Sequence, residues 1–147
     1  MRGGVRNWLA ALTLLAGTGV HAADNGGLPV ARLSAGMYLI HAEVARTPEA
    51  LQQGLMFRTE LGEQNGMLFL FPAHGTQCMW MRNTLIPLSV AFLHDDGTIA
   101  NIEDMAPQTD HSHCSAKPVR LALEMNAGWF AKRGLGPGTR IKGLPTR

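Results

Sequence analysis

Two stretches of the chain alternate between apolar and polar residues, which is the pattern of a β-strand with one face in the core. In the first stretch, residues 37–45, the apolar face leaves His41 pointing to solvent. In the second, residues 119–125, the apolar residues face inward, and Arg120 and Glu124 face outward. We therefore expect two half-buried strands that carry these polar side chains on their solvent side.

The continuous apolar run at residues 67–71 predicts a buried strand, and a second strand is expected over the mostly apolar residues 88–93. Pro72 is expected to end the first strand, because proline cannot donate to a strand ladder. The second strand leads into Asp95–Thr98, whose Asp-Gly pair accepts the positive φ angles of a type I′ hairpin turn. A returning strand is then expected over residues 99–105.

Two short α-helices complete the expected elements. Thr47 can cap the first, which begins at Pro48, and Gly54 either ends this helix or allows close packing. Asn126 can cap the second, which is expected to extend to Arg133. Because strands outnumber helices, the pattern predicts a mainly β domain.

The N-terminus has the features of a cleavable secretory signal peptide, residues 1–22. Arg2 and Arg6 supply the positive region, an apolar stretch follows over residues 8–20, and small residues precede the expected cut after Ala22. The apolar stretch is shorter than the roughly 20 residues that a membrane span needs. We therefore expect a periplasmic or secreted protein that keeps no stable membrane anchor after cleavage.

Removal of the signal leaves about 125 residues, which suits one globular domain. We divide this part into a flexible lead-in over residues 23–35, a β-rich domain over residues 36–143 and a tail over residues 144–147. Two of the thirteen Lys and Arg leave with the signal, so eleven remain against eleven Asp and Glu. This balance argues against a nucleic-acid partner.

The two cysteines, Cys78 and Cys114, are expected to form a disulfide, because an exported protein meets oxidising conditions. On the chain-entropy account, closing this loop stabilises the fold by about 3 to 4 kcal/mol. A metal thiolate or a nucleophilic cysteine are the alternatives. Neither cysteine belongs to a C-x-x-C motif.

Six ordered blocks of sequence together resemble the bacterial and archaeal family called domain of unknown function 192, over about Val44 to Ile141. The blocks are GLMFR (54–58), GMLFLF (66–71), WMRNTLIPLSVAF (80–92), the DDGT turn (95–98), VRLALEMNAGWF (119–130) and the turn at 134–138. The resemblance implies a compact, mainly β barrel or sandwich with short helices, frequently exported. It implies no activity.

The chain departs from the expected family pattern at two positions. Ser89 stands where the family is expected to carry Asp after the Pro-Leu pair, so no carboxylate is carried over to that position. Arg82 stands where Lys is usual, which keeps the positive charge but replaces a point charge with a planar donor fork.

The segment from Trp80 to Thr84 is a candidate binding surface. Trp80 offers an aromatic platform, Arg82 a charge, and Asn83 and Thr84 hydrogen-bonding groups, a mixture that suits a small polar or anionic ligand. Arg58 is a candidate to join Arg82 around an anion.

A structural role is the alternative for the same residues. Met79 and Met81 would then point inward from a strand, and Asn83 and its neighbour would bond the local main chain. Arg58 would pair with Glu124 or with a carbonyl group.

Two further classes of function remain open. Copper handling is suggested by possible soft ligands, namely His74, Met79, Met81, Met105, His111, His113 and Cys114. Those residues lack the tight spacing of a preformed site, so we assign no metal ligands. A hydrolase would have to use one of the available acids, chiefly Glu43, Glu103, Asp104 and Glu124, because the sequence contains no recognised catalytic motif.

We therefore expect an exported, non-catalytic binding or accessory domain that needs no cofactor. Its partner is an unidentified small polar or anionic ligand, or a protein. A periplasmic copper-handling protein and an unrecognised hydrolase are the alternatives.

Overall fold

The computed structural model describes residues 27–146. Strands dominate this part of the chain, which contains one α-helix, α1 (Pro48–Gln53). The strands are β1 (Val30–Ala35), β2 (Tyr38–Ala45), β3 (Asn65–Gly75), β4 (Cys78–Met79), β5 (Leu88–Leu93), β6 (Ile99–Met105), β7 (His113–Cys114), β8 (Val119–Asn126) and β9 (Ile141–Lys142). The mainly β fold class is confirmed, whereas the expected signal peptide, residues 1–22, lies outside the described residues.

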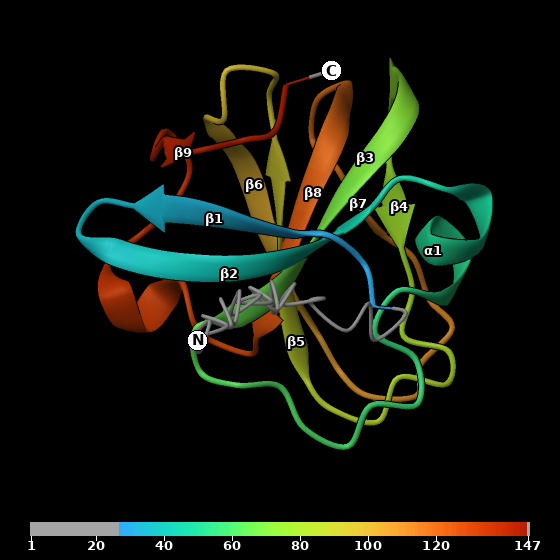
Figure 1. Cartoon of the computed structure of the whole chain (residues 1–147). Coiled ribbons are helices and arrows are strands. Elements are labelled where there is room, and N and C mark those ends of the chain that lie inside the picture. Colours follow the sequence, from blue (N-terminus) through green and yellow to red (C-terminus); the bar gives the residue numbers. More distant parts are fainter. Residues whose placement is uncertain (1–26, 147) are drawn as a thin grey trace, which may run out of the picture.

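Within residues 27–146, seven strands form one curled sheet in the order β6-β5-β8-β3-β2-β1-β9. Neighbouring strands are antiparallel except β2 and β3, which run parallel and are connected through α1. The two ends of the sheet meet, because the N–H of Ile99 donates to the carbonyl of Thr139 at 2.8 Å and that of Ile141 to Gly97 at 2.9 Å. In Figure 1, β1 and β2 cross in front of β3, β8 and β5 as a result of this curl.

Buried apolar side chains of the described range fall into two clusters, one on each face of the curled sheet. The first contains Trp129 and Phe130, and the second contains Phe69 and Phe92. α1 and the separate pair of strands β4 and β7 lie together at one side of the sheet in Figure 1, where Leu51 of α1 packs against the second cluster. Central strands are consequently covered on both faces.

This double covering corrects one expectation for β8. Glu124 was predicted to face solvent, but only 3% of its surface is exposed. Its strand neighbours Leu123 and Met125 enter the first cluster, so Glu124 projects toward the second one, beneath α1. The alternation of the strand was recognised, but the covering of its second face was not. His41, by contrast, is exposed as expected.

The first helix follows its predicted signals. The Thr47 hydroxyl accepts a hydrogen bond from the main-chain N–H of Ala50 at 3.2 Å, and Pro48 takes the first helical position. Gly54 ends the helix with a φ of 49°, and a Cβ atom there would lie 3.2 Å from the Phe69 ring. Both readings of this glycine therefore hold, since it ends the helix and allows close packing.

The expected second α-helix is instead a single 3₁₀ turn, Ala131–Arg133. Asn126 does not cap it, because its side-chain amide donates to the carbonyl groups of Leu61 and Gly62 at 2.9 and 3.2 Å. This amide therefore ties a distant loop to the end of β8 rather than starting a helix.

Two strand boundaries also differ from the predictions. β3 continues past Pro72 to Gly75, because regular pairing with β8 is interrupted after Leu70 and the proline lies in the irregular stretch. β1 occupies the second half of the expected lead-in, residues 23–35. Its small Ala and Ser residues give little hydrophobic signal, and pairing along β2 defines the strand.

The hairpin between β5 and β6 is present but is not the predicted type I′ turn. The N–H of Gly97 donates to His94 at 2.8 Å, and the N–H of His94 donates to Thr98 at 2.9 Å. Among these turn residues Gly97 alone has a positive φ, of 86°, whereas a type I′ turn needs two such residues.

None of the helices in residues 27–146 is long and apolar enough to cross a membrane.

Candidate functional site

Cys78 and Cys114 form a disulfide between β4 and β7, as predicted. Further contacts hold the flanking residues together: the N–H of Met81 donates to Thr109, and the N–H of Gln108 donates to Thr84, both at 3.0 Å. We call residues 78–84 and 108–114 the disulfide arm. The arm places the Trp80 segment beside α1, because the N–H of Phe57 donates to the carbonyl of Asn83 at 2.8 Å.

A surface groove of about 500 Å³ lies between α1 and the disulfide arm, and we call it the α1 groove. It is lined by Glu49, Gln52, Gln53, Met56, Phe57, Trp80, Arg82 and Asn83. Two of its aromatic side chains remain open to solvent, since Trp80 is 41% exposed and Phe57 is 65% exposed. Three of the five residues predicted as a binding surface thus meet in one groove.

Arg82 is held in place from two directions. Its guanidinium carbon lies 4.1 Å from the centre of the Trp80 ring, and its Nε donates to the carboxylate of Asp110 at 3.0 Å. The ion pair within the arm offsets much of the positive charge. Arg82 therefore holds the Trp80 ring in place, and it offers little unpaired positive charge to a ligand.

The next two residues in the arm have structural contacts. Asn83 adopts a positive φ of 55°, and its side chain lines the α1 groove. Thr84 is buried, and its hydroxyl donates to the carbonyl of Arg82 at 3.3 Å. Met79 and Met81 are buried, as the structural alternative required.

Arg58 does not line the α1 groove. Its guanidinium group donates two hydrogen bonds to the carboxylate of Glu43, at 2.5 and 2.7 Å, and this carboxylate raises the pKa of Arg58. The pair borders a different pocket, of about 230 Å³, whose other lining residues include Leu28. The partner proposed from the sequence, Glu124 or a carbonyl group, is therefore replaced by a residue of β2.

Glu124 was named from the sequence only as a candidate acid and a possible partner of Arg58, and its burial beside the α1 groove was missed. It lines a cavity of about 30 Å³ below the α1 groove, and burial raises the pKa of its carboxyl group to about 8. At neutral pH this carboxyl group is therefore mostly protonated. The cavity and the groove share four lining residues, namely Gln52, Gln53, Met56 and Trp80. The Glu between apolar residues of β8 was a signal, but the sequence did not show which face was covered.

The possible soft ligands are only partly gathered. His111 and His113 lie with ring centres 4.2 Å apart, and His113 is paired with Met79 across β4 and β7. Burial and the neighbouring His111 lower the pKa of His113. Cys114 is bound in the disulfide, and residues 27–146 contain no group of three or more His, Cys, Asp or Glu side chains placed to hold a metal.

The candidate acids of a hydrolase have separate environments. Asp104 accepts a hydrogen bond from Ser89, the residue that departs from the family pattern, and the same hydroxyl accepts from the N–H of Gly128 at 2.8 Å. Glu43 is bound by Arg58, and Glu103 accepts from Asn101 at 3.3 Å. None of these three lines the cavity of Glu124.

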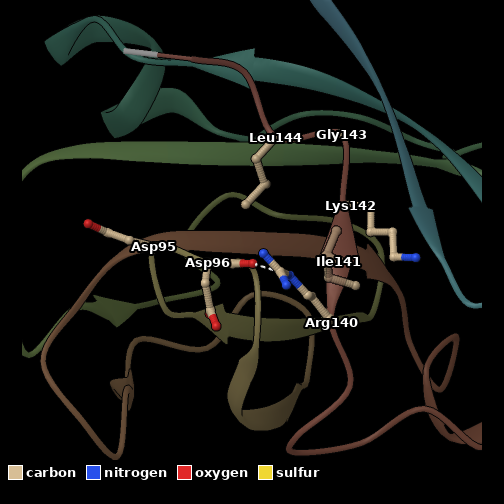
Figure 2. A pocket seen from close by; sticks show the side chains of 7 residues that line it. All are labelled: Asp95, Asp96, Arg140, Ile141, Lys142, Gly143 and Leu144. Atoms are coloured by element: carbon tan, nitrogen blue, oxygen red, sulfur yellow. Dashed lines mark hydrogen bonds between the residues drawn. The ribbon is translucent and has the colours of Figure 1, made fainter.

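A further pocket of about 360 Å³ lies between the β5–β6 hairpin and the C-terminal strand (Figure 2). Its polar groups at Arg140, Asp96 and Asp95 bond within the chain. Arg140 donates to the main-chain oxygen of Asp96 at 2.8 Å, and the Asp96 carboxylate accepts from Thr98. Asp95 points away from Arg140 in Figure 2 and pairs with Arg120. We therefore interpret this pocket as part of the junction where the two ends of the sheet meet, rather than as a binding site.

Comparisons with known proteins give one family and several similar solved structures. Residues 31–143 match domain of unknown function 192 (DUF192), described as "Uncharacterized ACR". A protein of unknown function from Novosphingobium aromaticivorans DSM 12444 is 31% identical, with a TM-score of 0.75, over 95% of this chain and 99% of that chain. A protein from Sinorhizobium meliloti 1021 described as a "putative transcription regulator" is 36% identical, with a TM-score of 0.72, over 78% of this chain and 92% of that chain. No curated protein matches the chain in sequence. The chain therefore belongs to the DUF192 family.

Proposed function

We propose that this DUF192 protein is an exported, non-catalytic binding domain whose α1 groove takes a small neutral polar ligand. The observation that carries the proposal is the exposed ring of Trp80, held by Arg82 at the edge of a groove of about 500 Å³. A groove of that size falls within the range of small-molecule sites. An exposed tryptophan gives a flat apolar contact area at a low cost in side-chain entropy.

The charges around the groove favour a neutral ligand over the anionic one that the sequence had left open. Arg82 is paired with Asp110, and Arg58 lies in another pocket beside Glu43. The groove also contains the carboxylate of Glu49, which would repel an anion. The positive charge needed to bind an anion is thus offset on every side of the site.

The hydrogen-bonding groups of the groove suit a polyhydroxylated ring such as a sugar. The amides of Gln52, Gln53 and Asn83 each offer both donors and an acceptor, which matches hydroxyl groups that do both as well. The apolar face of such a ring would lie against Trp80. We therefore name neutral sugars as the ligand class to test first.

Export is part of the proposal. The sequence of residues 1–22 is typical of a signal peptide, and the disulfide between Cys78 and Cys114 suits an oxidising compartment. The same disulfide removes the best soft ligand from the copper-handling alternative. The description of the Sinorhizobium relative as a transcription regulator is not extended to this chain, whose charges are balanced outside the signal.

The test uses the protein without residues 1–22, in its oxidised form, and a panel of neutral mono- and disaccharides. Two tryptophans remain, Trp80 and Trp129, so indole N–H signals in a nitrogen-15 NMR spectrum report on the groove and on the core separately. A bound sugar is expected to shift the Trp80 signal and to leave the signal of buried Trp129 in place.

Variants complete the experiment. Trp80→Ala is expected to weaken sugar binding at least about tenfold, because it removes the stacking surface. Leu39→Ala is the matched control, since Leu39 is an exposed apolar residue, 59% exposed, that does not line the groove. Arg82→Ala should weaken binding while keeping a near-normal melting temperature. Full affinity in both Trp80→Ala and Arg82→Ala would refute the proposal.

A further inference from the structure

We propose that the ligand of the α1 groove places an uncharged hydrogen-bond acceptor, the carbonyl oxygen of an acylamino group, in the small cavity where the carboxyl group of Glu124 donates to it. This inference rests on the proposed function and deepens it, because it narrows the ligand from neutral sugars to acylamino sugars.

The first support is the position of the cavity. It lies under α1 and is walled by β3, β4 and β8 through Phe69, Met79 and Glu124. Its volume of about 30 Å³ exceeds the ~10 to 15 Å³ that one water needs. Because the cavity shares lining residues with the α1 groove, a ligand in the groove can extend a group of a few atoms toward Glu124. A whole sugar ring would not fit.

The second support is the state of Glu124 itself. Its side chain is almost fully buried, and no group of residues 27–146 forms a hydrogen bond with its carboxyl. Buried polar groups are normally paired, and one left without a partner destabilises the fold. A buried carboxyl group that lines a cavity next to the α1 groove is thus placed to contact a ligand.

The third support is the protonation state of Glu124, which decides whether the ligand group beside it is a hydrogen-bond acceptor or a cation. Burial raises the pKa of Glu124 to about 8, so at neutral pH its O–H can donate to a carbonyl oxygen. The other described residues that line the cavity are apolar or neutral. The ionisable groups of the groove are Glu49 and Arg82. In the cross-strand row of Glu124 they are Glu103, beyond β5, and Glu43 with its partner Arg58, beyond β3. His113 of β7 lies opposite Met79, which lines the cavity.

The pH dependence has opposite signs for the two kinds of ligand. An acceptor binds the protonated acid, so its affinity should be constant at low pH and fall as pH rises through about 8. With one protonated form competent to bind, the dissociation constant at pH 9 should be about tenfold higher than at pH 6. An ammonium group would bind the carboxylate, so its affinity should rise as Glu124 ionises, as long as the ammonium group keeps its own proton.

The experiment compares three probes, N-acetylglucosamine, glucose and glucosamine, by isothermal titration and by the Trp80 indole signal at pH 6, 7.5 and 9. N-acetylglucosamine should bind at least about tenfold more tightly than glucose at pH 6 and lose that advantage at pH 9. In Glu124→Gln the side-chain amide can still donate, so binding should persist and become independent of pH. Glu60→Gln, on an exposed loop, is the matched control and should behave like the wild type.

The outcomes separate this inference from the proposed function. If all three sugars bind with a Trp80 shift but without preference for the acetylated one, or if the pH dependence persists in Glu124→Gln, the groove binds sugars and the inference is overturned. An affinity for glucosamine that is higher at pH 7.5, where the ammonium group and the carboxylate coexist, than at pH 6 would also overturn it, in favour of a cation. If no sugar moves the Trp80 signal at pH 6, the proposed function fails, and the inference with it.

Discussion

Replacing Glu124 by Gln should change how stability depends on pH. The carboxyl group has a pKa of 4.5 in its unperturbed state and of about 8 in the folded protein, where burial penalises its charged form. Between these values the folded state holds one proton that the unfolded state has released. The free energy of unfolding of the wild type therefore falls as pH rises, and this loss levels off above pH 8.

The size of the effect follows from the same two values. Each pH unit inside the window lowers the stability by about 1.4 kcal/mol, so the loss between pH 5 and pH 7 amounts to about 2 to 3 kcal/mol. The side chain of Gln does not titrate and has nearly the same shape. Glu124→Gln should therefore gain stability over the wild type by about this amount between pH 5 and pH 7.

Urea unfolding of both proteins at pH 5, 6, 7 and 8, with the disulfide intact, measures this difference. Subtracting the two curves cancels the other titrating groups, such as His113, whose lowered pKa makes stability rise with pH in part of the same range. Glu60→Gln controls for the loss of an exposed carboxylate. A difference between Glu124→Gln and wild type that stays constant from pH 5 to pH 8 would show that Glu124 is not buried in its protonated form.

Two further predictions concern the surroundings of the α1 groove. Reducing the disulfide between Cys78 and Cys114, which are 36 residues apart, should lower the free energy of unfolding by about 3 to 4 kcal/mol and weaken ligand binding, because the arm carries Trp80. Urea unfolding and titration with and without reductant measure both effects, and unchanged stability would contradict the role of the arm. Gly54→Ala should cost about 1 to 2 kcal/mol, since alanine is strained at a φ of 49° and its Cβ would press on Phe69. Thermal unfolding measures this loss, and Gly27→Ala, where nothing lies within 4 Å of the added Cβ, is the control.

The local elements could be predicted because their signals lie within a few neighbouring residues. The Thr47 cap, the first residue of α1 and the strands around Ile40 and Val90 follow from capping chemistry and from the spacing of apolar side chains. The disulfide followed from a count of two cysteines together with the signs of export. Where the local signal was weak, as in the Ala- and Ser-containing β1, the strand was missed.

The candidate site was predicted in part. Trp80, Arg82 and Asn83 do meet in one groove, because they are close in sequence and the arm holds them together. Arg58 belongs elsewhere, because its partner Glu43 comes from a strand whose pairing the sequence did not specify. A charged side chain pairs with whichever opposite charge the fold brings near, and that choice depends on contacts between distant segments.

Glu124 marks the boundary between what the sequence determined and what the tertiary structure decided. The sequence determined that its strand alternates, and so that Glu124 faces away from Leu123 and Met125. Whether that face meets water depends on α1 and the disulfide arm, which are far away along the chain and lie over that face only in the folded structure. Periodicity reports the direction of a side chain, whereas burial, and with it the pKa of the carboxyl group, is set by what packs against it.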